Sequence, residues 1–85
     1  MKISYSKAFV KQAHKLTPRQ KQKTAKRIEL FKQNPLHPHL RNHSLKGKYR
    51  GWRSIDIASD LRLLYIQTPQ EIIFDQIGTH SQLYG

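Results

Sequence analysis

The stretch WRSIDIASDLRLLYIQTPQEIIFDQI, residues 52–77, decides the fold, because it contains three apolar segments separated by two short turn sequences. Alternating or continuous apolar character predicts one strand in each of three segments: 52–57, 61–66 and 71–77. Ala58-Ser59-Asp60 and Thr68-Pro69-Gln70 supply the turns between them. Connections this short favour antiparallel pairing, so the three strands should form a meander.

Upstream of this stretch, the apolar residues recur with a helical period. Ser6 is a suitable N-cap for a first helix, because its side chain can accept a hydrogen bond from a free backbone N–H group. The apolar face of this helix should carry Phe9, Val10, Ala13 and Leu16.

A second helix should begin directly after the first. Thr17 at the N-cap, Pro18 at the first helical position and Gln20 two residues later form a capping-box pattern. This helix should span about 18–33, with Ala25, Ile28 and Phe31 facing inward, and Asn34-Pro35 should end it. The two helices would then form a hairpin with one apolar side, which must cover another element.

These elements predict an α+β fold. Lys2 to Tyr5 can form a short first strand, and residues 40–45 can add another before the meander. We therefore expect one domain, residues 1–85, in which an N-terminal helical hairpin packs on one face of a mostly antiparallel sheet of four to five strands. The opposite face of the sheet would be free for a ligand.

The charge balance points to an anionic partner. Sixteen Lys and Arg residues against five Asp and Glu residues give a formal net charge of +11. Such an excess attracts polyanions, and contacts with phosphates release counterions and so strengthen binding at low salt. Nucleic acid, an anionic membrane surface or an acidic protein are the partner classes that this charge favours.

Several other classes of protein and site are disfavoured. The chain has no Cys, which excludes disulfides and thiolate metal sites, and no stretch is apolar enough to span a membrane. The N-terminus lacks the apolar segment of a signal peptide, so we expect a cytoplasmic protein. His37-Pro38-His39 with His43 has no acidic partner nearby, so we interpret it as a loop and expect no metal or cofactor.

Cleavage of RNA without a metal needs few groups. A base removes the proton of the 2′-hydroxyl, the oxygen attacks the adjacent phosphorus, and an acid protonates the leaving 5′-oxygen. Cations stabilise the charge that develops on the phosphoryl oxygens. Candidates for these roles lie in the second half of the chain: His43, Lys46, Arg53, Asp56, Asp60, Arg62, His80 and Tyr84.

Each candidate also has a purely structural interpretation. Asp60 suits a turn, and Asp56 can pair with Arg53 or Arg62 on the sheet. Along the alternating strand Arg53 and Ile55 should share one face, while Trp52, Ser54 and Asp56 share the other. The Gly-Thr-His sequence at 78–80 is harder to explain by packing, because chain ends usually fray.

Four segments together resemble a known family: NHSLKG at 42–47, YRGWRSIDI at 49–57, DLRLLY at 60–65 and IGTHSQLYG at 77–85. They resemble the RelE/ParE toxin superfamily, and most closely its YafQ branch. The resemblance is sharp over residues 42–85 and only architectural over the helical hairpin. It implies a RelE-like fold and the toxin of a type II toxin–antitoxin system, which cuts mRNA on the ribosome. It also implies a cognate antitoxin, and operator DNA bound through the complex of the two proteins.

The resemblance assigns roles by position. His43 and His80 match catalytic His residues, Asp60 matches an acidic residue of the active site, and Tyr84 stands where relatives often have Phe. Lys46, Arg50 and Arg53 would bind RNA phosphates, and Arg62 would stabilise the transition-state charge.

Two positions depart from the family pattern. Asp56, which we also assign to the RNA-binding surface, replaces a His of some relatives, and Leu61 replaces a Trp of YafQ itself. His80 would act as general acid and His43 or Asp60 as general base, although the sequence leaves open which His gives the proton and which takes it.

Two other functions compete with this one. A ParE-like toxin shares the fold but inhibits DNA gyrase and cleaves no RNA. A basic nucleic-acid-binding module would explain the charge without any chemistry. The set His43, Asp60, His80 and Tyr84 argues against the first, because a gyrase inhibitor needs no acid–base pair. The second leaves the polar motif at the C-terminal end of the chain without a function.

Overall fold

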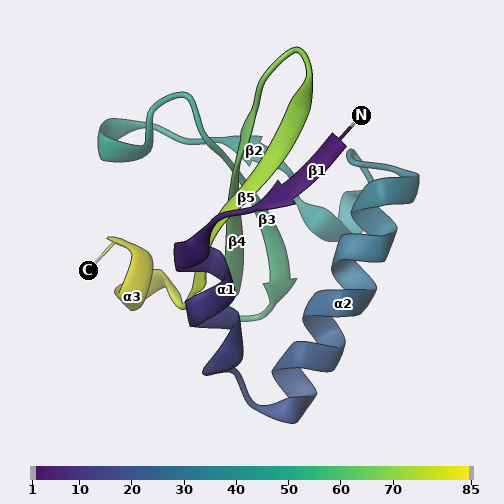
Figure 1. Ribbon diagram of the computed structural model, residues 1–85, viewed down its shortest axis with the longest axis vertical. Coiled ribbons are helices and arrows are strands. Elements are labelled where there is room, and N and C mark those ends of the chain that lie inside the picture. The colour runs from purple at the N-terminus through teal and green to yellow at the C-terminus, as the bar shows by residue number, and fades with distance from the viewer. Residues whose placement is uncertain (1, 85) are drawn as a thin grey trace.

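The computed structural model describes residues 2–84 and combines helices with one sheet (Figure 1). In chain order the elements are β1 (Lys2–Tyr5), α1 (Lys7–His14), α2 (Pro18–Gln33), η1 (Pro38–Leu40), β2 (His43–Ser44), η2 (Gly47–Tyr49), β3 (Arg53–Ala58), β4 (Leu61–Gln67), β5 (Glu71–Gly78) and α3 (His80–Tyr84). The elements η1 and η2 are single turns of 3-10 helix. The helix at the C-terminal end, α3, was not among the elements expected from the sequence.

The five strands form one sheet in the order β1-β5-β4-β3-β2. The meander of β3, β4 and β5 is antiparallel, as the short turns between these strands predict, and β1 pairs with β5 in parallel. The additional strand expected within 40–45 is confined to His43–Ser44, which pair with Ser54 and Arg53 of β3. The predicted α+β fold, with helices packed on a mostly antiparallel sheet, is confirmed.

The two faces of the sheet differ in chemistry. One face meets α1 and α2 and supplies most of the hydrophobic core, which includes Ile55, Ile57, Leu63, Tyr65 and Phe74. Neighbouring residues along a strand point to opposite faces, so Ser54, Asp56, Arg62 and Leu64 lie on the other face. The register brings Asp56 of β3 beside Arg62 of β4 on that second face.

The inward face of α1 differs from the expectation at Val10. Phe9 is buried as predicted, whereas Val10 is 47% exposed. Gln12 takes an inward position instead, because its Oε1 accepts a hydrogen bond of 2.8 Å from the backbone N–H of Ile77. That N–H group belongs to the part of β5 that extends past its pairing with β1, so Gln12 satisfies a donor at the sheet edge.

The inward face of α2 was also partly misassigned. Phe31 is buried and Ile28 is half-buried, as predicted, but Ala25 is exposed and Thr24 is buried in its place. Thr24 can be buried because its hydroxyl donates a hydrogen bond of 2.8 Å to the carbonyl oxygen of Gln20 one turn earlier. A polar residue whose hydrogen bond is satisfied within the helix thus replaces the alanine that the pattern favoured.

The predicted capping box of α2 is present. Thr17 Oγ1 accepts from the backbone N–H of Gln20 at 3.1 Å, and Gln20 Oε1 accepts from the backbone N–H of Thr17 at 2.9 Å. Replacing Thr17 by Ala should lower the free energy of unfolding by about 1 kcal/mol. Urea denaturation would measure the loss, with the exposed Gln22→Ala in the same helix as control. Equal unfolding midpoints for both variants would contradict this role of the cap.

Candidate active site

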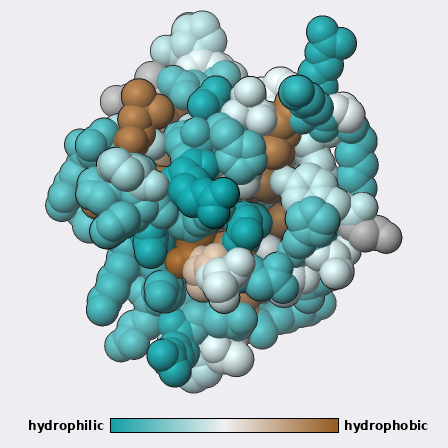
Figure 2. Space-filling model, turned by 180° about the vertical axis from the view of Figure 1, so that it is seen from behind, coloured by the Kyte–Doolittle hydropathy of each residue, from teal (hydrophilic) through white to brown (hydrophobic). Residues whose placement is uncertain are grey.

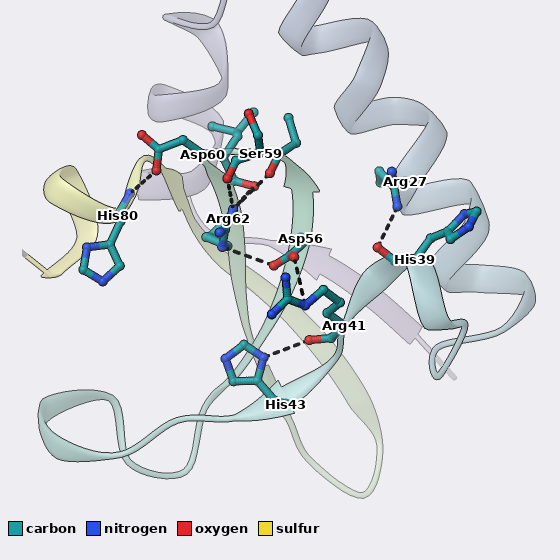
Figure 3. Close-up of polar contacts among 11 residues, drawn as sticks. Arg27, His39, Arg41, His43, Asp56, Ser59, Asp60, Arg62 and His80 are labelled. Atoms are coloured by element: carbon teal, nitrogen blue, oxygen red, sulfur yellow. Dashed lines mark hydrogen bonds and ion pairs between the residues drawn. The ribbon is translucent and has the colours of Figure 1, made fainter.

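Arg41, Asp56 and Arg62 form a polar cluster on the sheet face that points away from the helical hairpin (Figure 3). Arg62 Nε lies 3.1 Å from Asp56 Oδ1, and both side chains are largely buried. Arg62 Nη1 donates to the carbonyl oxygens of Ala58 and Ser59 at 3.0 and 3.2 Å. The β3–β4 turn and Asp56 therefore hold the guanidinium in one orientation.

Arg41 is a second cation of this cluster, and the sequence analysis missed it. Its Nε lies 3.6 Å from Asp56 Oδ2, so the Asp56 carboxylate is placed between two guanidinium groups. Unlike Arg62, the Arg41 side chain is 77% exposed. Its backbone has a φ of 47°, in the left-handed region that residues other than glycine seldom adopt. An arginine in so basic a chain gives no sequence signal that would have singled it out.

His43 lies beside Arg41, on the edge strand β2 (Figure 3). Its Nδ1 is 2.8 Å from the carbonyl oxygen of Arg41. A carbonyl oxygen can only accept, so Nδ1 carries the proton and the neutral ring has its free lone pair on Nε2. The side chain is exposed, and the arrangement offers a proton acceptor on a fixed imidazole.

The C-terminal helix α3 brings His80 to the same region (Figure 3). The backbone N–H of His80 donates to Asp60 Oδ1 at 3.3 Å, and Leu83 is buried, so both ends of this short helix are attached to the rest of the protein. A Cβ at Gly78, just before this helix, would lie 2.9 Å from Gln82 Oε1, so a larger residue there would make the Gln82 side chain shift. The sequence analysis found the Gly-Thr-His segment hard to explain by packing, but the hydrogen bond to Asp60 and the buried Leu83 give it a structural role. Gly85 lies outside the described residues.

Tyr84 packs against His80, with the ring centroids 4.8 Å apart. Burial raises the pKa of the Tyr84 phenol above its usual value and the nearby Tyr49 adds to the rise, whereas Arg62 and the Ser54 hydroxyl lower it. The phenol therefore stays protonated at neutral pH and can donate a hydrogen bond.

The remaining basic candidates divide between two surfaces. Lys46 and Arg50 are exposed on the segment that contains η2. Arg53 shares the face of Ile55, as predicted, and its Nε donates to Asn42 Oδ1 at 2.8 Å. Arg53 lines a cavity of about 820 Å³ with Phe31 and Tyr65, so the structure does not bring it to the cluster around Arg62.

The histidine-rich loop makes contacts of its own. The rings of His37 and His39 are 4.8 Å apart, and the backbone N–H of His39 donates to His37 Nδ1 at 3.1 Å. The carbonyl oxygen of His39 accepts from Arg27 Nη1 at 2.8 Å. Within residues 2–84, no group of three His, Asp or Glu side chains is arranged to hold a metal ion.

The molecular surface is dominated by hydrophilic residues. Figure 2 shows the protein from behind, where apolar atoms reach the surface only in small areas between polar side chains. None of the helices in the described part of the chain is long and apolar enough to cross a membrane. Near the largely buried Arg62 and Asp56, the side chains of Arg41, His43 and His80 are exposed to solvent.

Comparisons with known proteins agree with the sequence motifs. The family described as "Bacterial toxin of type II toxin-antitoxin system, YafQ" matches residues 1–85. A protein of Haemophilus influenzae named YafQ is 33% identical over 93 aligned positions, which cover 96% of this chain and 90% of the relative. The mRNA interferase toxin YafQ of Escherichia coli is 33% identical over 51 residues, 60% of this chain and 55% of the relative.

A solved structure shares the fold over nearly the whole chain. The toxin chain in the crystal structure of the E. coli DinJ-YafQ toxin-antitoxin complex has a TM-score of 0.82 and 28% identity, with 98% of this chain and 96% of that chain covered. The family match spans both the helical hairpin and the sheet that carries the polar cluster. The chain therefore belongs to the YafQ family of bacterial toxins of type II toxin–antitoxin systems.

Proposed function

We propose that this toxin is an endoribonuclease that cleaves mRNA on the ribosome by metal-independent acid–base catalysis. The observations that carry the proposal are three contacts: Asp56 holds Arg62 on the sheet face away from the helical hairpin, the backbone of His80 is bonded to Asp60 in the β3–β4 turn, and His43 is bonded to Arg41 (Figure 3). These contacts involve the proton-transferring and anion-stabilising groups that the reaction needs. The relative named an mRNA interferase toxin supports the choice of substrate.

His43 is the preferred general base and His80 the general acid. The hydrogen bond from Nδ1 to the carbonyl oxygen of Arg41 leaves Nε2 of neutral His43 free to take the proton of the 2′-hydroxyl. The 2′-oxygen then bonds to phosphorus, the bond to the 5′-oxygen breaks, and protonated His80 supplies that oxygen with a proton. Asp60 remains the alternative base, although its Oδ1 already accepts from the backbone of His80.

The developing charge on the phosphate would be stabilised by Arg62, with Lys46 and Arg50 holding the RNA backbone. Arg62 is oriented before substrate binds, because Asp56 and two carbonyl oxygens fix its guanidinium. Asp56 positions Arg62 and Arg41 rather than binding the anion itself. Tyr84 supports the ring of His80 and can donate to a phosphoryl oxygen as a neutral phenol. The product is a 2′,3′-cyclic phosphate or its hydrolysed 3′-phosphate.

We also propose that a cognate antitoxin binds and silences this toxin, as the DinJ-YafQ complex suggests. A chain of net charge +11 favours an acidic partner segment, and the exposed Leu36 offers it an apolar contact. Operator DNA would be bound only through the complex of the two proteins. A toxin that meets mRNA on ribosomes would act in the cytoplasm.

The proposal is tested by incubating the purified toxin with mRNA, with and without ribosomes, and mapping ends by primer extension. New 5′-ends should appear only in the presence of ribosomes. A parallel assay of gyrase supercoiling tests the ParE-like alternative. Intact mRNA together with inhibited supercoiling would reject the nuclease, and retarded RNA without cleavage would reduce the protein to a binding module.

A further inference from the structure

The segment between β2 and β3, residues 45–52, forms an ordered loop beside the polar cluster; we call it the basic loop. Its ends are joined by a hydrogen bond of 2.9 Å from the Leu45 N–H to the carbonyl oxygen of Trp52. The Trp52 N–H donates to the carbonyl oxygen of Tyr49 at 3.0 Å. Gly47 and Gly51 have φ values of 66° and 91°, which favour glycine at both bends. The loop therefore presents its side chains in a defined arrangement.

Two aromatic side chains of the basic loop lie together outside the hydrophobic core. The rings of Tyr49 and Trp52 have centroids 5.0 Å apart with planes at 48°, and both residues are only partly buried. Tyr49 and Tyr84 pack in a T-shaped arrangement with ring centroids 5.5 Å apart. The pair thus adjoins the residue that packs on His80, while part of its aromatic surface stays open to solvent.

Cations flank these rings along the loop, because Lys46 and Lys48 precede Tyr49 and Arg50 lies between Tyr49 and Trp52. Lys46, Lys48 and Arg50 are exposed, and none of them forms an ion pair with an acidic side chain within the described part of the chain. Lys48 Nζ lies 5.1 Å from the centroid of the Tyr49 ring. Arg41 and Arg62, in contrast, are both paired with Asp56. Lys46, Lys48 and Arg50 are therefore available to bind an external anion, and they lie close in sequence to Tyr49 and Trp52.

We propose that Tyr49 and Trp52 form a stacking site for a nucleobase of single-stranded RNA, with the cations of the basic loop on the flanking phosphates. Single-stranded RNA is commonly bound by aromatic faces beside basic side chains, because each base has a π-face and each linkage a charge. The choice of RNA rests on the proposed function. The contact between Tyr49 and Tyr84 would place the stacked base next to the nucleotide that is cleaved.

Tyr49 also has a structural contact that a test must separate from stacking. Its hydroxyl donates to the carbonyl oxygen of Leu83 at 2.9 Å and so ties the basic loop to α3. Tyr49→Phe removes this hydrogen bond and keeps the ring. Tyr49→Leu removes both, so the comparison of the two variants isolates the contribution of the ring.

The experiment uses Trp52, the single tryptophan of the chain, as the probe. Two oligonucleotides are titrated at low salt: a 2′-O-methyl adenosine octamer, which has no attacking hydroxyl, and an abasic octamer with the same phosphates. The adenosine octamer should quench Trp52 emission and the abasic one should not. Affinity for each octamer is measured separately, by the fluorescence anisotropy of a dye on its 5′-end. Tyr49→Leu should weaken binding of the adenosine octamer by about fivefold to a hundredfold and leave binding of the abasic octamer unaffected, whereas Tyr49→Phe should retain the wild-type affinity.

Equal quenching by both oligonucleotides, or an equal loss of affinity for both in Tyr49→Leu, would overturn the stacking site. His80→Ala separates this result from the proposed function, because it should lose mRNA cleavage and keep base-dependent quenching. Base-dependent quenching by a wild-type protein that leaves mRNA intact on ribosomes would reject the nuclease and retain the stacking site. Cleavage of mRNA without base-dependent quenching would retain the nuclease and reject the stacking site.

Discussion

His80→Ala should reduce ribosome-dependent mRNA cleavage by about 10²- to 10⁴-fold, the usual contribution of a positioned general acid. The substitution leaves the backbone N–H of His80, and therefore its hydrogen bond to Asp60, in place. The lost imidazole is exposed and outside the core, so the fold should persist. Single-turnover cleavage on programmed ribosomes measures the rate.

His14→Ala is the matched control for this variant. His14 is likewise exposed but lies at the end of α1, away from the polar cluster. The His14→Ala variant should therefore cleave mRNA at the wild-type rate. Thermal unfolding of both variants checks that the protein remains folded. A His80→Ala protein with wild-type cleavage would remove this residue from the reaction.

Arg62→Ala should lower the cleavage rate by about 10²- to 10³-fold, as expected when a preorganised group facing developing charge is removed. Arg62→Lys keeps the charge, but an ammonium cannot reproduce the contacts of the guanidinium with Asp56 and the β3–β4 turn. It should therefore remain well below the wild type. The exposed Arg19→Ala, on α2, changes the net charge equally and should be close to wild type.

The role of Asp56 can be measured against the same background. If Asp56 acts by orienting Arg62, Asp56→Asn should slow cleavage in the wild type and change little once Arg62 is already Ala. Additive losses in the double variant would show that Asp56 acts independently of Arg62. A faster reaction in Asp56→Asn would instead mean that the carboxylate repels the substrate phosphate.

The sheet was predictable because its signals are local. Alternation of side chains fixed the faces of β3, and the short turns at 58–60 and 68–70 imposed antiparallel neighbours. The capping box likewise located the start of α2 from adjacent residues. The parallel pairing of β1 with β5 was not predicted, because it joins segments from opposite ends of the chain.

The helix faces were harder to predict because polar residues can be buried when a neighbour satisfies them. Thr24 bonds within its own helix and Gln12 bonds to the edge of β5, so both replace apolar residues that the period favoured. Val10 and Ala25, which the period placed inward, are exposed. The apolar period alone does not predict such exchanges.

The candidate site shows the same division. The sequence proposed His80, Asp60 and Arg62 as site residues; the structure bonds the His80 backbone to Asp60 and bonds Arg62 to the β3–β4 turn that contains Asp60. Arg41 could not be found, because its position depends on a left-handed backbone in a loop and on Asp56 from a different strand. The separation of Arg53 from this site follows from strand alternation, once the face that packs on the helices is known.

The most direct test of the proposed chemistry is cleavage of two otherwise identical mRNAs on the ribosome, one of which carries a single 2′-deoxynucleotide at the position that is cut. We expect the all-RNA message to be cleaved with a 2′,3′-cyclic phosphate or 3′-phosphate at the new end, and the deoxy message to stay intact. Cleavage of both messages at equal rates would show that the 2′-oxygen is not the nucleophile and would contradict the mechanism assigned to His43, His80 and Arg62.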